Sequence, residues 1–280
     1  MPVVLRLDRL LASRGYCSRS QAGDFLRSHA VVLESRRLAR GEEKLPSDAP
    51  LLIDNEPIDP PTLLILLHKP LGFVCSRDDL GQLVYELLPE RWSRRNPPIS
   101  TVGRLDKDTS GLLLLTDDGP LLHRLTSPKQ HVPRVYLATL QHPLRGDEPD
   151  LFASGTLQLD GDDKPLLPAH MEVVAPTLAR LTLREGRYHQ VRRMFAAVGN
   201  HVVALHRERI GNLALDDLAP GQHRLLDASA RSLLDPAAPS PSDRVEPSPS
   251  DPAAPSPFDR AAPPQLDPKA TPLLHPTPPR

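Results

Sequence analysis

The sequence predicts an α+β protein in three parts, and three observations carry this prediction. Two short helical patterns rich in arginine open the chain, strand-like aliphatic runs alternate with short helices from Leu63 onward, and a proline-rich tail ends it. We therefore expect a small domain at residues 1–56, a linker at 57–62, a larger sheet domain at 63–230 and a disordered tail at 231–280.

The first part is expected to combine helices with short strands. Leucines at 7, 10 and 11 form an apolar stripe at helical spacing. Ser18-Arg19-Ser20-Gln21 has the pattern of a capping box, leading into a helix that ends near Ser28. Strands are predicted at 30–33 and around 51–53, with polar turns between them.

The second part is predicted to be mostly sheet. Two helices are well marked: one follows the cap Asp118 and the early Pro120, and the other spans 191–198 and stops at Gly199. The strand-like runs, in chain order, are LLILL, GFVCS, ISTV, LLLL, VYLATL, MEVV, ARLTLRE and HVVALH.

The tail accounts for much of the high proline content, which is 34 of 280 residues. DPAAPSPSDR, beginning at Asp235, recurs as DPAAPSPFDR from Asp251. Such a segment has too little apolar surface to form a core, so we expect it to be extended and solvated, an appendage rather than a recognition element.

The charge distribution favours a nucleic-acid partner although the formal net charge is only -1. One basic cluster lies between Arg6 and Arg40, and a second runs from Arg184 to Arg209. Lys and Arg bind phosphates by displacing condensed counterions, so local clusters matter more than the sum. In the first cluster three acidic residues accompany eight arginines: Arg6, Arg9, Arg14, Arg19, Arg27, Arg36, Arg37 and Arg40.

Two cysteines, Cys17 and Cys75, lie far apart without a partner Cys or His at ligand spacing. Neither a disulfide framework nor a structural zinc is expected. The longest aliphatic run, at 63–67, is too short to cross a bilayer. We expect a cytoplasmic protein with no membrane partner.

The strongest candidate for chemistry is Asp106, in VGRLDKDTSGLLLLTDDG. It follows a short strand pattern and precedes a Thr-Ser-Gly turn, so its carboxylate should be presented at the surface. In an extended segment Arg104 would project to the same side, pair with the carboxylate and keep it ionised. An ionised aspartate can act as a nucleophile or a base.

Three other interpretations of this segment compete with a catalytic aspartate. Asp106, Asp108, Ser110 and Gly111 match the first half of an EF-hand loop, but Leu114, Asp117 and a strand-like 112–115 do not match the second. An Asp-x-Asp phosphatase motif normally follows an uninterrupted apolar strand, which Gly103 and Arg104 break. A solvated acidic turn is the third interpretation, and it would be preferred for the motif in isolation.

A second segment, EGRYHQVRRMFAAVGNHVVALHRERIG, adds a basic helix and a strand. At helical spacing His189, Arg192 and Arg193 would share one face, opposite a buried stripe. Arginines on an exposed face suit phosphates, although an ordinary amphipathic helix with a solvated basic side would have the same pattern.

Together these motifs make the chain resemble the RsuA/RluB/RluE/RluF family of pseudouridine synthases, and most of all its RsuA type, which acts on 16S rRNA. The resemblance covers nearly everything before the tail. The N-terminal RLDRLLASRGYCSRSQAGDFLRS is similar to an RNA-binding domain shared with a ribosomal small-subunit protein. The catalytic motifs are GRLDKDTSGLLLLTDDG, LHKPLGFVCS, Arg134-Val135-Tyr136-Leu137 and the segment beginning EGRYHQVRRM.

The resemblance implies a mostly antiparallel, mixed-sheet catalytic domain with flanking helices, and it implies roles for residues. Asp106 stands where the family has its essential aspartate, Tyr136 where it has an active-site tyrosine, and Arg192 where a basic residue pairs with that aspartate. Arg104 belongs to the aspartate motif. The residues expected to bind RNA are Arg6, Ser18, Arg19, Arg27, Lys69, His189 and Arg193.

The sequence departs from the family in small ways. The usual glycine turn after the first domain's Val-x-Val strand is replaced by Leu33-Glu34-Ser35, so the tip of that hairpin is not predicted. His68 stands where asparagine is commoner, and Arg134 replaces a usual lysine; both changes keep hydrogen-bond donors.

The implied reaction turns uridine into pseudouridine in ribosomal RNA, most simply at one uridine of 16S rRNA. It gains no atom, so no cofactor or metal is expected, and Asp106 would act as nucleophile or base. The expected partner of this monomer is 16S rRNA or a small-subunit assembly intermediate. The alternatives are action on 23S rRNA, a non-catalytic RNA-binding assembly factor, and a metal-dependent hydrolase that uses Asp106 and Asp108.

Overall fold

The computed structural model describes residues 3–234, so the predicted tail lies almost entirely outside the described residues. The N-terminal segment has the expected helices, α1 (Leu7–Ser13) and α2 (Ala22–Ser28). Leucines of α1 and α2 pack with Val31, Leu38 and Leu51 into one core. Its strands are β1 (Val4–Arg6) paired with β4 (Lys44–Pro46), and a sheet in the order β3 (Arg36–Arg37), β2 (Val31–Leu33), β5 (Leu52–Ile53) and β6 (Glu56–Pro57).

The capping box forms one turn before the helix rather than on it. Ser18 N donates to Gln21 Oε1 at 3.2 Å and Gln21 N donates to Ser18 Oγ at 3.3 Å, whereas α2 begins at Ala22. The hairpin tip that the sequence left open turns at Glu34 and Ser35, with φ of 47° and 71°. Two successive residues in the left-handed region form the tight two-residue turn that joins the strands of a hairpin. Here neither residue is glycine.

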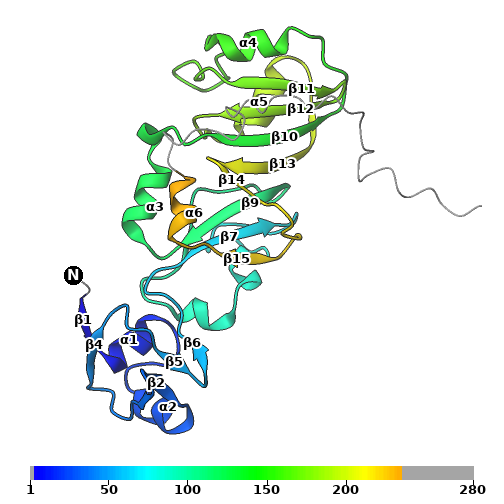
Figure 1. The fold of residues 1–280 in the computed structure, drawn as a ribbon. Coiled ribbons are helices and arrows are strands. Elements are labelled where there is room, and N and C mark those ends of the chain that lie inside the picture. Colours follow the sequence, from blue (N-terminus) through cyan, green and yellow to red (C-terminus); the bar gives the residue numbers. More distant parts are fainter. Residues whose placement is uncertain (1–2, 235–280) are drawn as a thin grey trace, which may run out of the picture. The chain divides into compact units, whose positions relative to one another are not determined.

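The larger part is built on a nine-stranded sheet, in the order β11-β12-β10-β13-β9-β7-β15, with β14 beside β13 and β8 beside β9 (Figure 1). Only β9 and β13 run parallel among its described strand pairs, which confirms the mostly antiparallel mixed sheet. The strands are β7 (Leu64–Lys69), β8 (Ser100–Thr101), β9 (Thr109–Thr116), β10 (Arg134–Leu140), β11 (His170–Ala175), β12 (Leu178–Leu183), β13 (Val202–Ile210), β14 (Leu213–Ala214) and β15 (His223–Leu225).

One predicted strand is wrong. GFVCS lies in a turn and loop, in which Val74 makes only an isolated bridge to Leu83. Val74 and Cys75 are consecutive and both buried, at 6% and 5% exposure, so the segment lacks the alternation of a strand with one buried face. The other runs all contribute residues to strands.

Both marked helices are confirmed. Asp118 caps α3 (Gly119–Thr126) by accepting from Leu121 N at 3.0 Å. The second is α5 (Gln190–Ala197), followed by Gly199 at φ 76°. The remaining helices are α4 (Glu148–Ser154), α6 (Ala228–Ser232) and the 3-10 turns η1 (Val84–Leu87), η2 (Glu90–Arg94) and η3 (Pro128–Gln130). No helix among the described residues is long and apolar enough to cross a membrane.

Helices cover different parts of the sheet, as Figure 1 shows for α3 and α6 beside β9 and for α4 and α5 beside β10 to β12. Leu121 and Leu125 of α3 pack with Leu112 and Leu114 of β9. Met194 and Phe195 of α5 pack against β10, β12 and β13 in a separate cluster. A third cluster uses Ile65 and Leu67 of β7 with Leu113 and Leu115 of β9, so the sheet joins three cores.

Gly111 permits the close approach of β9 and β13. Its φ is 115°, and a Cβ placed there would lie 2.3 Å from the backbone oxygen of Arg207. Any other residue would therefore clash with β13 as well as strain the backbone. This glycine of the TSGLLLL run lets Arg207 sit directly beside β9.

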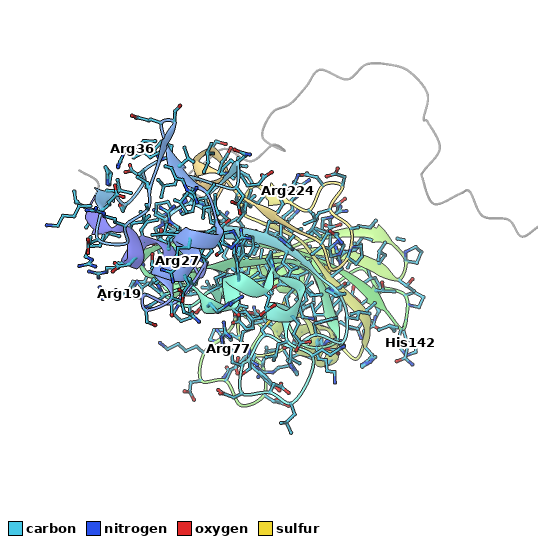
Figure 2. All side chains as sticks on the ribbon, turned by 90° about the horizontal axis from the view of Figure 1, so that it is seen from below. Arg19, Arg27, Arg36, Arg77, His142 and Arg224 are labelled. Atoms are coloured by element: carbon cyan, nitrogen blue, oxygen red, sulfur yellow. The ribbon has the colours of Figure 1, made fainter. Side chains whose placement is uncertain are left out.

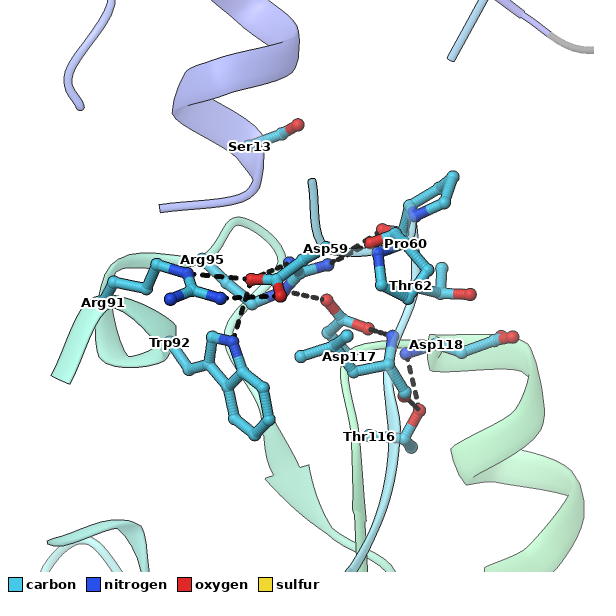
Figure 3. Close-up of polar contacts among 12 residues, drawn as sticks. Ser13, Asp59, Pro60, Thr62, Arg91, Trp92, Arg95, Thr116, Asp117 and Asp118 are labelled. Atoms are coloured by element: carbon cyan, nitrogen blue, oxygen red, sulfur yellow. Dashed lines mark hydrogen bonds and ion pairs between the residues drawn. The ribbon is translucent and has the colours of Figure 1, made fainter. Parts of the chain in front are cut away.

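A buried ionic cluster, made of Asp59, Arg91, Trp92, Arg95 and Asp117, ties the predicted linker to the sheet (Figure 3). Asp59 accepts from Arg91 at 2.7 and 2.9 Å and from Trp92 Nε1 at 2.9 Å. Arg95 Nε donates to Asp117 Oδ2 at 2.7 Å, at the end of β9. The Arg95 side chain is fully buried, and the Asp117 side chain is 2% exposed.

The N-terminal segment contacts the same region. Tyr16 Oη accepts from Asp59 N at 3.1 Å, and Ser13 O accepts from Asn96 N at 2.9 Å. Burial and the neighbouring charge of Arg95 lower the pKa of Arg14, in the same segment, to about 10. The linker is therefore held by side chains from both sides of it.

Candidate active site

A cavity of about 450 Å³ contains the predicted catalytic residues. The turn before β9 forms one wall, and the starts of β10 and α5 form others. The loop between β12 and α5, the segment between α3 and β10, and β13 complete it. Asp106, Tyr136, Arg104, Arg192 and His189 all line this cavity, so the fold brings together residues from three distant segments.

Asp106 lies in the turn 103–108, just before β9, and its side chain is 36% exposed. Its carboxylate Oδ1 lies 3.3 Å from His189 Nε2. Its backbone oxygen accepts from Thr109 N at 3.1 Å. The carboxylate is thus presented to the cavity, as expected, with an imidazole as its neighbour.

Lys69 has a different place from the one predicted. It was expected to bind RNA, but it is fully buried. Its Nζ donates to the backbone oxygens of Asp106 at 2.9 Å, Thr109 at 2.8 Å and Pro70 at 3.1 Å. Burial lowers the pKa of Lys69. The ammonium instead fixes the backbone of the turn that carries Asp106.

The expected pairing of Arg104 with Asp106 is not formed among the described residues. Residues 102–108 make bends and a turn instead of an extended strand, so alternate side chains do not share a face. Arg104 is exposed and lines the same cavity. The Arg104 side chain is therefore accessible to a ligand in the cavity.

Arg192 was also expected to pair with Asp106, and the structure pairs it with Asp108. Its Nη2 lies 2.8 Å from Asp108 Oδ2 and 3.1 Å from the Asp108 backbone oxygen, and Nη1 donates to Val202 O at 2.9 Å. Arg192 therefore links α5, the turn and β13. Lys69 contacts backbone oxygens of this turn, including that of Asp106. Arg192 contacts the Asp108 carboxylate and the backbone oxygens of Asp108 and Val202.

His189 does not share a helical face with Arg192 and Arg193, because it precedes α5. It has a left-handed backbone, φ 49°, and serves as the N-cap residue. Its ring stacks on Tyr188, with centroids 3.9 Å apart and planes at 16°. Arg193, which was predicted to bind RNA, pairs instead with the loop at 160–162. Its Nη2 donates to Asp162 Oδ1 at 2.8 Å.

Tyr136 lies on β10 beside Arg207 of β13, with which it is in register. Arg207 Nη1 donates to Tyr136 Oη at 3.3 Å, and Nε donates to Leu112 O at 2.7 Å. Arg207 is 2% exposed, and its Nη2 is buried without a partner among the described residues. A buried cation thus sits against the phenol at the bottom of the cavity.

The predicted RNA-binding residues of the N-terminal segment are exposed. Figure 2 shows the side chains of Arg19, Arg27 and Arg36 projecting from this segment. Arg6 pairs with Asp8 at 2.9 Å, Arg27 pairs with Asp24, and Ser18 Oγ bonds to Gln21 Oε1 at 2.8 Å. The Arg27–Asp24 pair is exposed on both sides and contributes little stability, so Arg27 can exchange partners.

The other interpretations of the Asp106 segment receive no support from its surroundings. Residues 112–115 belong to β9, so no helix exits from the turn as in an EF-hand. Asp108, the second acid of an Asp-x-Asp pair, is engaged by Arg192. Within residues 3–234 no three His, Cys, Asp or Glu side chains are grouped to hold a metal ion.

Comparisons with known proteins show the family of this chain. Residues 63–197 match the family model described as RNA pseudouridylate synthase. The chain is 44% identical over 228 residues to "Ribosomal small subunit pseudouridine synthase A" of Escherichia coli (strain K12), covering 79% of this chain and 96% of that one. The chain belongs to the pseudouridine synthase family.

Other members give the same result. The protein of the same name from Yersinia pestis is 42% identical, over 79% of this chain and 94% of that one. The one from Vibrio cholerae serotype O1 is 40% identical, over 79% and 96%. A solved structure described as "Crystal structure of pseudouridylate synthase" has a TM-score of 0.58 and 39% identity, over 82% of this chain and 99% of that chain.

Sequence reasoning missed two residues that line this cavity. Arg207 was part of a recognised motif, but nothing in a strand pattern shows that its partner would be Tyr136. Tyr188 was read only as part of the EGRYHQ motif, yet it is 76% exposed and lines the cavity. An aromatic residue between two basic ones, Arg187 and His189, is the signal that could have indicated it.

Proposed function

We propose that this protein isomerises one uridine of 16S small-subunit ribosomal RNA to pseudouridine. The observation that carries the proposal is the meeting of Asp106, His189 and Tyr136 at one cavity in a chain 44% identical to a named small-subunit pseudouridine synthase. The match covers 96% of that relative's length and 79% of this chain.

The reaction breaks the bond from the ribose to the base nitrogen, turns the uracil and joins the ribose to a ring carbon, which then loses its proton. Asp106 serves as the ionised carboxylate, acting as nucleophile or base. His189 stands beside its Oδ1, and Tyr136 receives the flat face of the uracil and helps to remove the proton from the rejoined carbon. The uridine reaches the cavity only when it is flipped out of its stack.

Arginines on the cavity wall suit the phosphates of a flipped nucleotide. Arg104 and Arg184 are both exposed there, and the guanidinium group binds phosphate oxygens well because its donors form a planar fork. Residues 1–56, with exposed Arg19 and Arg27, bind the RNA outside the target nucleotide. We further infer that the protein needs no cofactor, because the isomerisation gains no atom, and that it acts as a monomer in the cytoplasm.

The test compares wild-type protein with Asp106→Asn, which keeps the shape of the side chain and removes its charge. Pseudouridines are mapped across 16S and 23S rRNA in cells that lack the gene and carry either form. We expect one 16S position to depend on the wild-type protein and to stay uridine with Asp106→Asn. Asp150→Asn, an exposed carboxylate on α4, is the matched control and should convert like wild type.

Each other outcome selects an alternative. Conversion by Asp106→Asn would refute the catalytic role of that residue. A dependent site in 23S rRNA would move the substrate to the large subunit. If Asp106→Asn restored growth or ribosome assembly as well as wild type did, a binding factor would be the better description.

A further inference from the structure

Tyr188 is an exposed aromatic residue that has no role in the proposed reaction. Its side chain is 76% exposed, although it lines the same cavity as Asp106. Burying a large aromatic ring removes 150–250 Å² from water, so leaving one exposed at a cavity rim forgoes a favourable free energy. Such a ring is available to a ligand.

One face of the Tyr188 ring is already covered. His189 stacks on it at 3.9 Å between centroids and 16° between planes, and His189 in turn contacts Asp106 at 3.3 Å. The high exposure of Tyr188 leaves its other face open to solvent. The two rings therefore form a short stack that begins at the catalytic carboxylate and ends in an open aromatic face.

Contacts of two neighbouring arginines hold the segment that carries this stack in place. Tyr188 O accepts from Arg193 Nη1 at 3.4 Å, and Arg193 is itself held by Asp162. Arg187 is held by Asp162 and Glu185 at 2.8 and 3.1 Å. The residues on both sides of the ring pair are thus fixed by ion pairs, so the open face has a defined position.

We propose that Tyr188 stacks on an unpaired nucleobase of the RNA, next to the flipped target uridine. This rests on the proposed function and adds a second base-binding position to it. Every nucleobase has a flat face that can stack on an aromatic ring, and proteins that bind single-stranded RNA use this contact widely. Arg104 and Arg184 on the same cavity wall supply positive charge for the phosphates that connect the two nucleotides.

The test uses a 16S rRNA fragment selected because the wild-type protein binds it, and the fragment includes the converted uridine where conversion occurs. Its affinity for the protein and its rate of conversion in a single turnover are measured separately. We expect Tyr188→Ala to bind the fragment about tenfold more weakly, as for the loss of one base stack. Tyr188→Phe keeps the ring and should bind like wild type. Val173→Ala, which also removes exposed apolar surface but lies outside the cavity, is the matched control.

A series of fragments, each with one base removed near the target, identifies the contact. For wild-type protein, removal of the stacked base should weaken binding about tenfold; for Tyr188→Ala, removal of that same base should have no further effect. Equal sensitivity of both proteins at every position would overturn the proposal. So would wild-type affinity of Tyr188→Ala.

The two proposals fail in different ways. If wild-type protein converts no uridine while Tyr188→Ala still weakens binding, the reaction is wrong and the stacking stands. If conversion proceeds and affinity is insensitive to Tyr188, the stacking is wrong and the reaction stands. A thermal unfolding midpoint equal to that of wild type shows that Tyr188→Ala is folded.

Discussion

His189 Nε2 lies 3.3 Å from Asp106 Oδ1, and it is His189, not an arginine, that contacts the carboxylate. The left-handed backbone of His189 directs its ring toward the turn from the start of α5. Arg192, one turn further, contacts Asp108 instead. The side chain nearest to the proposed catalytic carboxylate is therefore an imidazole, placed by the backbone at the start of α5.

Replacing His189 by asparagine should lower the rate of conversion. Asparagine tolerates a left-handed backbone, so α5 should begin as before. We expect the loss of this 3.3 Å contact to lower kcat about tenfold, which corresponds to about 1.4 kcal/mol of transition-state stabilisation. Single-turnover conversion of the rRNA fragment measures this.

The control for that variant is His142→Asn, an exposed histidine far along the chain from the turn. It should react at the wild-type rate. A His189→Asn protein as fast as this control would mean that the 3.3 Å contact has no part in the reaction.

Removing the Lys69 ammonium should destabilise the protein and slow it. Lys69→Met leaves three backbone oxygens, those of Pro70, Asp106 and Thr109, without their buried donor. We expect the free energy of unfolding to fall by about 3 kcal/mol, because buried acceptors that lose a charged partner are costly. Urea denaturation measures the loss.

Lys107→Met is the matched control, since Lys107 is exposed in the same turn. Its unfolding free energy should stay within about 0.5 kcal/mol of wild type. Unchanged stability in Lys69→Met would show that the ammonium does not hold the turn.

Breaking the buried ionic cluster should have a larger effect on stability than removing a surface arginine. Arg95→Met leaves Asp117, only 2% exposed, without its partner at 2.7 Å. Removing one member of a buried pair typically costs about 3–5 kcal/mol. Arg94→Met removes a neighbouring exposed arginine and should cost less than about 1 kcal/mol.

Chemical denaturation of the two variants compares these costs directly. Similar losses for Arg95→Met and Arg94→Met would contradict the view that the cluster holds the linker against the sheet. Adding Asp117→Asn to Arg95→Met should recover part of the loss, because the stranded charge is then removed.

Periodicity and caps predicted most of the fold. The Asp118 cap, the 191–198 stripe and the aliphatic runs each correspond to an element, because local backbone preference and one buried face decide them. The strand predicted for GFVCS was wrong because its consecutive residues Val74 and Cys75 are both buried in a loop. A run of apolar residues alone does not distinguish that from a strand.

The site was predictable in its members but not in its contacts. The resemblance to a known family pointed to Asp106, Tyr136 and Arg192, and all three line one cavity. Which cation meets which carboxylate depends on the turn at 103–108 and on the position of His189, which are tertiary features. Lys69 was assigned to RNA because sequence does not show that its aliphatic neighbours on β7 bury it.

The parallel pairing of β9 and β13 also determines when the enzyme can first be assembled. Ser110 and His206, which bond across this pair, are 96 positions apart in the chain. Contacts so distant form only after a large loop has closed, and a ribosome makes the chain from its N-terminus. The turn that carries Asp106 therefore emerges long before the strand that supports it, so a nascent chain stays inactive until β13 has been synthesised and has found its place.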